Sequence, residues 1–117
     1  MRGEQYLTKP EQYATIYNKG ASWANNIIVL KTLPNNLELS RYGLSVSNRV
    51  GEAVTRNKVK RRLREIIRQI QLVPGWDIVL VARPAAARVE YNVLHDSVKS
   101  LCSKARLITG NRSQEIV

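Results

Sequence analysis

The chain has 117 residues, which is enough for one domain with a hydrophobic core but too few for two. Hydrophobic residues make up 44% of it, which excludes a disordered protein, and five Tyr and two Trp supply the aromatic side chains because Phe is absent. The net charge of +10 predicts a polyanionic partner, with nucleic acid favoured over an anionic membrane surface or a role in solubility alone.

The sequence predicts a cytoplasmic protein. No apolar run approaches the roughly 18 residues of a membrane span. The first residues, MRGEQYLTKPEQY, lack the apolar core of a signal peptide. Cys102 is the one cysteine and cannot form an internal disulfide, which fits a reducing compartment.

The first predicted element is a helix that runs to about Lys19, just before a glycine. Thr8 and Glu11 have the spacing of a capping box, and Pro10 is tolerated in the first turn. Positions at helical spacing share one face of this helix: Tyr13, Ile16 and Tyr17.

Two predicted strands follow, and their patterns differ. The run IIVLKTL at 27–33 is β-branched and indicates a buried strand, whereas RYGLSVSNRV at 41–50 alternates apolar and polar residues and indicates a half-buried one. The Pro-Asn-Asn run at 34–36 predicts a hairpin turn between them.

After Gly51 the apolar period becomes that of a helix. The stretch TRNKVKRRLREIIR at 55–68 holds seven positive side chains and one acid, Glu65. Its apolar residues fall within an arc of roughly 100°, the width of a core-facing stripe. They are Val59, Leu63, Ile66, Ile67 and Ile70.

The exposed side of this helix forms a cationic ridge. Lys58, Arg62 and Glu65 lie on one flank, and the other flank and the back carry, in order, Arg56, Lys60, Arg64, Asn57, Arg68 and Arg61. Arg and Lys side chains suit phosphate oxygens. Asn57, a neutral amide among cations, indicates a hydrogen bond to a base, a 2′-OH or the backbone, with helix capping as the alternative.

The last third of the chain predicts one strand and one helix. Pro74-Gly75 precedes the strand WDIVLVA at 76–82, and a helix from about 89 to 107 follows. Its apolar stripe contains Leu94, Val98, Leu101, Cys102 and Ala105. Cys102 is therefore interpreted as a core thiol, His95 and Asp96 as solvated, and the tail GNRSQEIV as frayed. The order of elements predicts an α+β fold, an α/β sandwich.

The residue inventory offers no catalytic or metal site. Asp occurs only at positions 77 and 96, the seven Glu are scattered, and there is one His and one Cys. A nuclease metal site needs clustered carboxylates, and a catalytic triad or zinc site needs more His or Cys. We predict that the chain has no active site of its own.

The stretch YGLSVSNRVGEAVTRNKVKRRLREIIR at 42–68 resembles the signature of the protein subunit of bacterial ribonuclease P. The matching positions are Gly43 to Ser47, Val50-Gly51, Ala53-Val54, Arg56-Asn57, Lys60-Arg61 and Arg64. QYATIYNKGAS resembles the family's first helix, and PGWDIVLVARP resembles its last strand. The likeness covers about residues 8–107, which we take as the ordered core of a single domain over 1–117.

The resemblance implies an αβββαβα fold around a four-stranded sheet, with a left-handed βαβ crossover that the usual handedness rule does not favour. It implies an accessory subunit of a ribozyme. The partners would be the ribonuclease P catalytic RNA and precursor tRNA. The RNA and its bound Mg²⁺ would cleave the precursor and release the 5′ leader, so the holoenzyme would be an endoribonuclease.

The resemblance also assigns site residues. The set that would contact RNA is Arg56, Asn57, Lys58, Lys60, Arg61, Arg64, Arg68, Asn48 and Arg49. A cleft between the first helix and the sheet would hold the single-stranded leader, with Tyr13, Tyr17 and Lys31 along it. Both tyrosines could stack on bases or simply pack in the core.

The chain departs from the family pattern at several positions. Lys58 replaces a second arginine, the Asn48-Arg49 pair replaces two lysines, and Lys31 stands where an aromatic residue is common, which exchanges a stacking contact for a phosphate contact. The alternatives are a ribosomal or chromosomal nucleic-acid-binding protein and a helix-turn-helix DNA-binding module. Against the latter, the basic helix of this chain is framed by strands and lacks the companion helix that would lie across a major groove.

Overall fold

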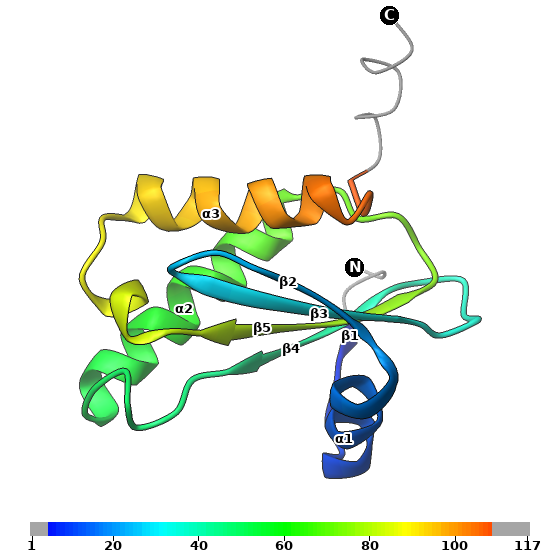
Figure 1. Ribbon diagram of the computed structural model, residues 1–117, viewed down its shortest axis with the longest axis horizontal. Helices are drawn as coiled ribbons and strands as arrows, with labels where there is room; N and C mark the ends of the chain where they lie inside the picture. The colour runs from blue at the N-terminus through cyan, green and yellow to red at the C-terminus, as the bar shows by residue number, and fades with distance from the viewer. Residues whose placement is uncertain (1–4, 109–117) are drawn as a thin grey trace, which may run out of the picture.

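Strand β5 lies in the centre of a mixed sheet in the computed structural model, which describes residues 5–108 (Figure 1). The elements are β1 (Gln5–Tyr6), α1 (Pro10–Lys19), β2 (Ala21–Ala24), β3 (Ile28–Pro34), β4 (Arg41–Ser45), α2 (Ala53–Gln69), β5 (Trp76–Ala82), a 3₁₀ turn η1 (Pro84–Ala87) and α3 (Tyr91–Lys104). The predicted α+β order of helices and strands is confirmed. A two-residue strand, β1, adds a fifth strand at the edge of the predicted four.

The predicted hairpin between the runs at 27–33 and 41–50, which form β3 and β4, is wrong. The strand order is β1-β4-β5-β3-β2, so β5 lies between β3 and β4, antiparallel to the former and parallel to the latter. Three consecutive β5 residues, Ile78, Val79 and Leu80, have no exposed surface. A strand that is apolar on both sides belongs in the middle of a sheet covered on both faces, which the local turn signal at 34–36 could not reveal.

The β4–α2–β5 connection is a crossover between parallel neighbours. Its left-handed sense stays a prediction. β2 was not located by the sequence, because ASWA contains no β-branched residue.

Strand β4 is shorter than the predicted 41–50 run. It ends at Ser45, and a turn follows in which the Val50 N–H bonds the Ser47 carbonyl at 3.1 Å and the Arg49 N–H bonds the Ser47 hydroxyl at 3.3 Å. The serine side chain thus offers the backbone a local partner that competes with sheet pairing.

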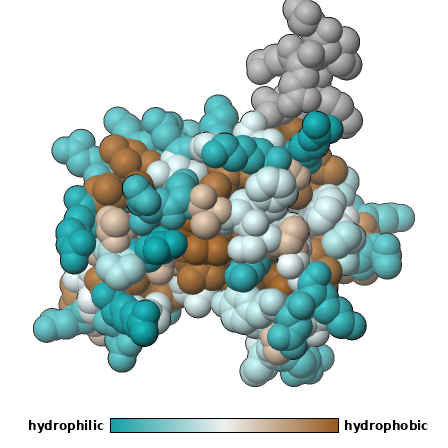
Figure 2. Space-filling model, viewed as in Figure 1, coloured by the Kyte–Doolittle hydropathy of each residue, from teal (hydrophilic) through white to brown (hydrophobic). Residues whose placement is uncertain are grey.

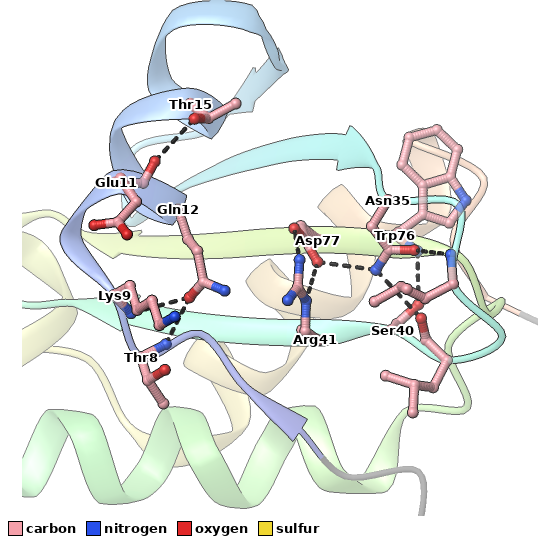
Figure 3. Close-up of polar contacts among 12 residues, drawn as sticks. Thr8, Lys9, Glu11, Gln12, Thr15, Asn35, Ser40, Arg41, Trp76 and Asp77 are labelled. Atoms are coloured by element: carbon pink, nitrogen blue, oxygen red, sulfur yellow. Dashed lines mark hydrogen bonds and ion pairs between the residues drawn. The ribbon is translucent and has the colours of Figure 1, made fainter.

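The start of α1 also differs from the prediction. Lys9 is the N-cap residue, and the side-chain oxygen of Gln12 accepts the backbone N–H groups of Thr8 at 2.9 Å and Lys9 at 3.0 Å (Figure 3). The capping box of Thr8 with Glu11 is therefore wrong. Gln12 lies at the third helical position, where an amide satisfies the unpaired N–H groups as a carboxylate would.

The sheet separates two apolar layers. On one face, side chains of β3, β4 and β5 pack against α2 and α3. Their predicted stripes are buried: Val59, Leu63, Ile66, Ile67 and Ile70 of the α2 segment, and Leu94, Val98, Leu101 and Cys102 of α3, with Ala105 half-buried. On the other face, Ile16 of α1 packs with Leu7 and Val79.

Cys102 is a core residue, as predicted. Its side chain is fully buried, and burial raises the pKa of its thiol to about 12. The thiol is therefore neutral and unreactive at physiological pH.

His95 and Asp96 lie at the edge of the α3 stripe, where Nδ1 of His95 is 3.4 Å from Oδ1 of Asp96. No helix within residues 5–108 is long and apolar enough to cross a membrane. The tail GNRSQEIV lies outside the described residues.

An ion pair between half-buried Arg41 and buried Asp77 joins β4 to β5 at one end of the sheet. Arg41 of β4 donates from Nε to Oδ1 of Asp77 at 2.8 Å and from Nη2 to Oδ2 at 2.7 Å, and the Asn35 amide adds a bond to Oδ1 at 2.9 Å (Figure 3). The Arg41 pKa is raised chiefly by its hydrogen bonding to Asp77. Ser40 bonds the Val73 carbonyl and the Trp76 N–H, so the same end is tied to the connection before β5.

Replacing Arg41 should destabilise the protein strongly. Arg41→Met leaves the Asp77 carboxylate, whose side chain is 8% exposed, without its main partner, and we expect a loss of about 3 kcal/mol in the free energy of unfolding, measured by urea denaturation. Arg88→Met is the matched control, because Arg88 is exposed and its side chain makes no polar contact within the described residues. Equal losses in the two variants would contradict a specific role for the pair.

Candidate nucleic-acid interface

The basic ridge is the set of cationic and amide side chains on the exposed side of α2. Burial of the aliphatic stripe against the sheet turns this side toward solvent. Asn57, Lys58, Arg61 and Arg68 are exposed, and Arg56, Lys60 and Arg64 are half-buried. The helix is therefore fixed to the sheet by one side and carries concentrated positive charge on the other.

Some ridge arginines already have intramolecular partners. Nε of Arg56 donates to the Gly51 carbonyl at 3.1 Å, and Nη2 of Arg68 donates to the Tyr6 hydroxyl at 3.0 Å. On the other flank, Nη1 of Arg62 is 3.4 Å from the Val89 carbonyl. These bonds restrict the arginine side chains, so less conformational entropy remains to be lost when a partner binds.

Other ridge residues have no intramolecular partner among the residues that the structure describes. Lys58, Lys60 and Arg61 form neither a hydrogen bond nor an ion pair with any residue that the structure describes. Their donors are available to an anionic partner, and Lys and Arg side chains offer no acceptor that would compete.

Asn57 is not a helix cap. The N-cap of α2 is Glu52, so Asn57 lies within the helix, and its exposed side chain has no hydrogen-bond partner in the described part of the chain. The capping alternative is therefore wrong, and the amide is presented to solvent between cations.

The connection between β4 and α2 extends the charged surface. Asn48 and Arg49 are both exposed there, just before the helix begins. The backbone N–H of Arg49 donates to the Ser47 hydroxyl, and the side chains of Asn48 and Arg49 make no polar contact within the described residues. Arg49 thus adds one cation to the exposed connection, and the exposed N-cap residue Glu52 adds one acid before the helix.

A cleft lies on the opposite face of the sheet, because α1 covers only part of that face. Val29, Lys31 and Val81 are half-exposed and point to the same side as Val79, since strand pairing sets Val29 opposite Val81 and Lys31 opposite Val79. Figure 1 shows α1 at one end of this face and the β4–α2 connection at the other, and Figure 2 shows the surface hollowed between them, with hydrophobic side chains at the centre.

Tyr13 forms the inner wall of the cleft. Its hydroxyl donates to the Leu7 carbonyl at 3.4 Å, and burial, followed by the neighbouring Tyr17, raises its pKa. The ring lies against Gly43 of β4, where any Cβ atom would overlap it. Tyr13 is therefore half-buried and held by packing against the cluster of Leu7, Ile16 and Val79.

Tyr17 and Lys31 are brought together at the outer wall. Tyr17 is 41% exposed, which does not fit simple core packing. Nζ of Lys31 lies 5.9 Å from the centroid of its ring, a cation–π arrangement. An aromatic face and a positive charge therefore adjoin at the rim of the cleft.

A small pocket lies beside the first turns of α1. It has a volume of about 210 Å³ and is lined by Glu11, Gln12, Thr15, Ile16, Leu33, Arg41 and Asp77. No predicted site residue lines it. Within residues 5–108, no three His, Cys, Asp or Glu side chains are grouped so as to hold a metal ion.

The sequence missed Tyr6 as a member of the charged surface. Its hydroxyl accepts the bond from Arg68, and its ring packs on Tyr42 at a centroid distance of 4.9 Å. A single tyrosine before the first helix carries no periodic signal, so only the pairing of β1 with β4 could place it beside α2.

Comparison with known proteins identifies the family of this chain. The family model described as Ribonuclease P matches residues 1–106. The ribonuclease P protein component of Dehalococcoides mccartyi is 45% identical over 93% of this chain and 91% of its own length. That of Roseiflexus castenholzii is 37% identical over 97% and 96%.

Solved structures agree with these sequence relatives. The RNase P protein of Staphylococcus aureus aligns with a TM-score of 0.81 at 31% identity, covering 89% of this chain and 97% of that one. The RNase P protein of Thermotoga maritima aligns with a TM-score of 0.76 at 29% identity, covering 83% and 94%. The predicted family and its α+β fold are thus confirmed.

Proposed function

We propose that this chain, which belongs to the ribonuclease P protein family, brings two RNAs together through the basic ridge and the cleft. It is a protein component of ribonuclease P, an endoribonuclease that acts in tRNA 5′ processing. The ridge would bind the catalytic RNA, and the cleft would hold the single-stranded 5′ leader of precursor tRNA. The RNA subunit would carry out the cleavage.

The observation that carries this proposal is the pairing of two dissimilar surfaces on opposite faces of one sheet. The ridge on α2 presents Lys58, Lys60 and Arg61 without intramolecular partners in the described chain, as a surface for a phosphate backbone should. The cleft combines apolar floor and aromatic wall, which suits unpaired bases rather than a duplex.

Within the cleft, the proposed roles follow from exposure and charge. The exposed ring of Tyr17 would stack on a leader base, which is worth roughly 1 to 3 kcal/mol. Lys31, beside that ring, would bind the adjoining phosphate. Tyr13 would act mainly as a fixed wall, because its hydroxyl and ring are already held by Leu7 and Gly43.

Magnesium would be bound by the RNA subunit and the substrate. The ridge consists of Lys, Arg and one Asn, and Lys and Arg side chains carry no oxygen ligand of the kind that Mg²⁺ requires. Such residues do not fit a magnesium site. They would instead neutralise phosphates where two RNAs approach each other and so reduce the magnesium concentration that the RNA needs.

The ridge should give RNA binding a strong dependence on salt. If about five phosphates are engaged, log K for a bacterial ribonuclease P RNA should fall with log salt at a slope of roughly −3.5 to −4.5. Lys60→Ala with Arg61→Ala should reduce the magnitude of that slope by about 1.4 to 1.8, since two phosphate contacts are lost. Filter binding over a range of potassium chloride concentrations measures both.

The control is Lys99→Ala with Lys104→Ala, which removes two exposed cations from α3. Its slope should match the wild type. The same proteins should be tested for stimulation of precursor tRNA cleavage by the RNA at low magnesium. A slope near zero, or no stimulation of a competent RNA, would contradict the proposed function and favour a general nucleic-acid-binding protein.

The cleft should make the holoenzyme prefer precursor tRNA to mature tRNA. Tyr17→Leu removes the stacking face but keeps an apolar side chain, so we expect the ratio of the two affinities to fall at least fivefold, with mature tRNA bound as before. Competition binding to the reconstituted holoenzyme measures this ratio. Tyr91→Leu, on α3, is the matched control. An unchanged ratio in Tyr17→Leu would show that the leader does not stack there.

A further inference from the structure

Tyr6 is an exposed aromatic residue that the fold holds beside the C-terminal half of the basic ridge. The backbone of β1 pairs with β4, with Tyr6 directly opposite Tyr42, and the Leu7 N–H continues the pairing to the Tyr42 carbonyl at 2.9 Å. The side chain of Tyr6 nevertheless remains 42% exposed. Its ring is therefore held by neighbouring residues and is still accessible to a partner.

The ring is fixed from two directions. Its centroid lies 4.9 Å from that of Tyr42 at an interplanar angle of 56°, and its hydroxyl accepts the hydrogen bond from Nη2 of Arg68 at 3.0 Å. The Tyr6 pKa is lowered, first by the neighbouring Tyr42 hydroxyl and then by Arg68, with Arg64 adding a further charge effect. The ring therefore has two guanidinium groups in its surroundings and little freedom left to lose on binding.

The position of Tyr6 separates it from the cleft. Directly paired residues of neighbouring strands share a face, so Tyr6 lies on the side of Tyr42, which packs in the layer with α2 and α3. The next residue, Leu7, packs on the opposite side with Ile16 and Val79 under α1. A nucleotide on Tyr6 would therefore be a different nucleotide from any that occupies the cleft.

We propose that Tyr6, Arg64 and Arg68 form a binding site for one unpaired nucleotide of RNA, whose base stacks on the exposed part of the Tyr6 ring. Arg64 and Arg68 would attract the phosphate of that nucleotide, since a single guanidinium group can donate hydrogen bonds to two phosphate oxygens at once. The inference rests on the proposed function of the ridge and adds to it a stacking contact that charge alone does not provide. The surrounding residues supply all three parts of the site: a fixed ring, its supporting neighbour and nearby cations.

The unpaired nucleotide could come from the catalytic RNA or from the leader of the precursor. Because Arg64 and Arg68 belong to the ridge, and the ring faces away from the cleft, the geometry favours the catalytic RNA. Binding of each RNA should therefore be measured separately, with the catalytic RNA alone in one arm and precursor against mature tRNA on the assembled holoenzyme in the other.

The test compares Tyr6→Leu with Tyr6→Phe. Tyr6→Leu keeps apolar contact with Tyr42 but removes the stacking face, so affinity for the catalytic RNA should fall at least fivefold at fixed salt. Tyr6→Phe keeps that face, so the logarithm of its affinity should fall by less than half as much as in Tyr6→Leu. The salt slope should be unchanged in both, because stacking releases no counterions. Tyr91→Leu is the matched control, because the hydroxyl of Tyr91 likewise accepts a hydrogen bond from an α2 side chain, that of Gln69.

A loss confined to the precursor arm would support the site and identify the leader as its ligand. Wild-type affinity of Tyr6→Leu in both arms would overturn the inference, and so would equal losses in Tyr6→Leu and Tyr6→Phe, which would mean that the hydroxyl only positions Arg68. A loss that disappears when affinity is corrected for the folded fraction, measured by circular dichroism, would also overturn it. If only the Tyr6 site is wrong, the wild type still binds the catalytic RNA with a salt dependence and still stimulates cleavage. If the proposed function is wrong, the wild type shows neither.

Discussion

The burial of the aliphatic stripe of α2 is the interaction on which the basic ridge depends. Four side chains of the helix, Val59, Leu63, Ile66 and Ile67, are at most 2% exposed, and their burial contributes about 6 to 12 kcal/mol. Like-charged pairs four residues apart cost about 1 to 2 kcal/mol in total. Burial therefore dominates, and the helix can carry a concentration of positive charge that would not be stable without the sheet behind it.

The central strand β5 divides the molecule into its two working sides. On one side the sheet packs against α2 and α3 in the larger apolar core, and the ridge and Tyr6 lie at the surface of that layer. On the other side α1 is only ten residues long and leaves Val29, Lys31 and Val81 partly open. The ion pair of Arg41 with Asp77 fixes β4 to β5 at the α1 end. The cleft is thus a consequence of a short helix on a well-anchored sheet.

The sequence was informative where a residue's environment is set by local periodicity. The α2 stripe, the β5 strand at 76–82 and the buried position of Cys102 were all predicted, because each belongs to a regular apolar pattern. The hairpin was wrong because strand order depends on long-range pairing, and the capping box was wrong because Gln12 competes with Glu11 for the same N–H groups.

The candidate site divides in the same way. The exposed ridge followed from the helical wheel, whereas the meeting of Tyr17 with Lys31, and of Tyr6 with Arg68, depends on tertiary structure that no spacing encodes.

The central claim, that the exposed side of α2 faces the catalytic RNA, is tested most directly by site-specific crosslinking. Asn57→Cys and Lys99→Cys place single reactive thiols on α2 and α3, and the native Cys102 thiol stays unlabelled because its pKa is about 12. With a short photoreactive group attached, position 57 should crosslink to ribonuclease P RNA in the assembled holoenzyme and position 99 should not. Equal crosslinking from both positions, or crosslinking from position 99 alone, would contradict the account.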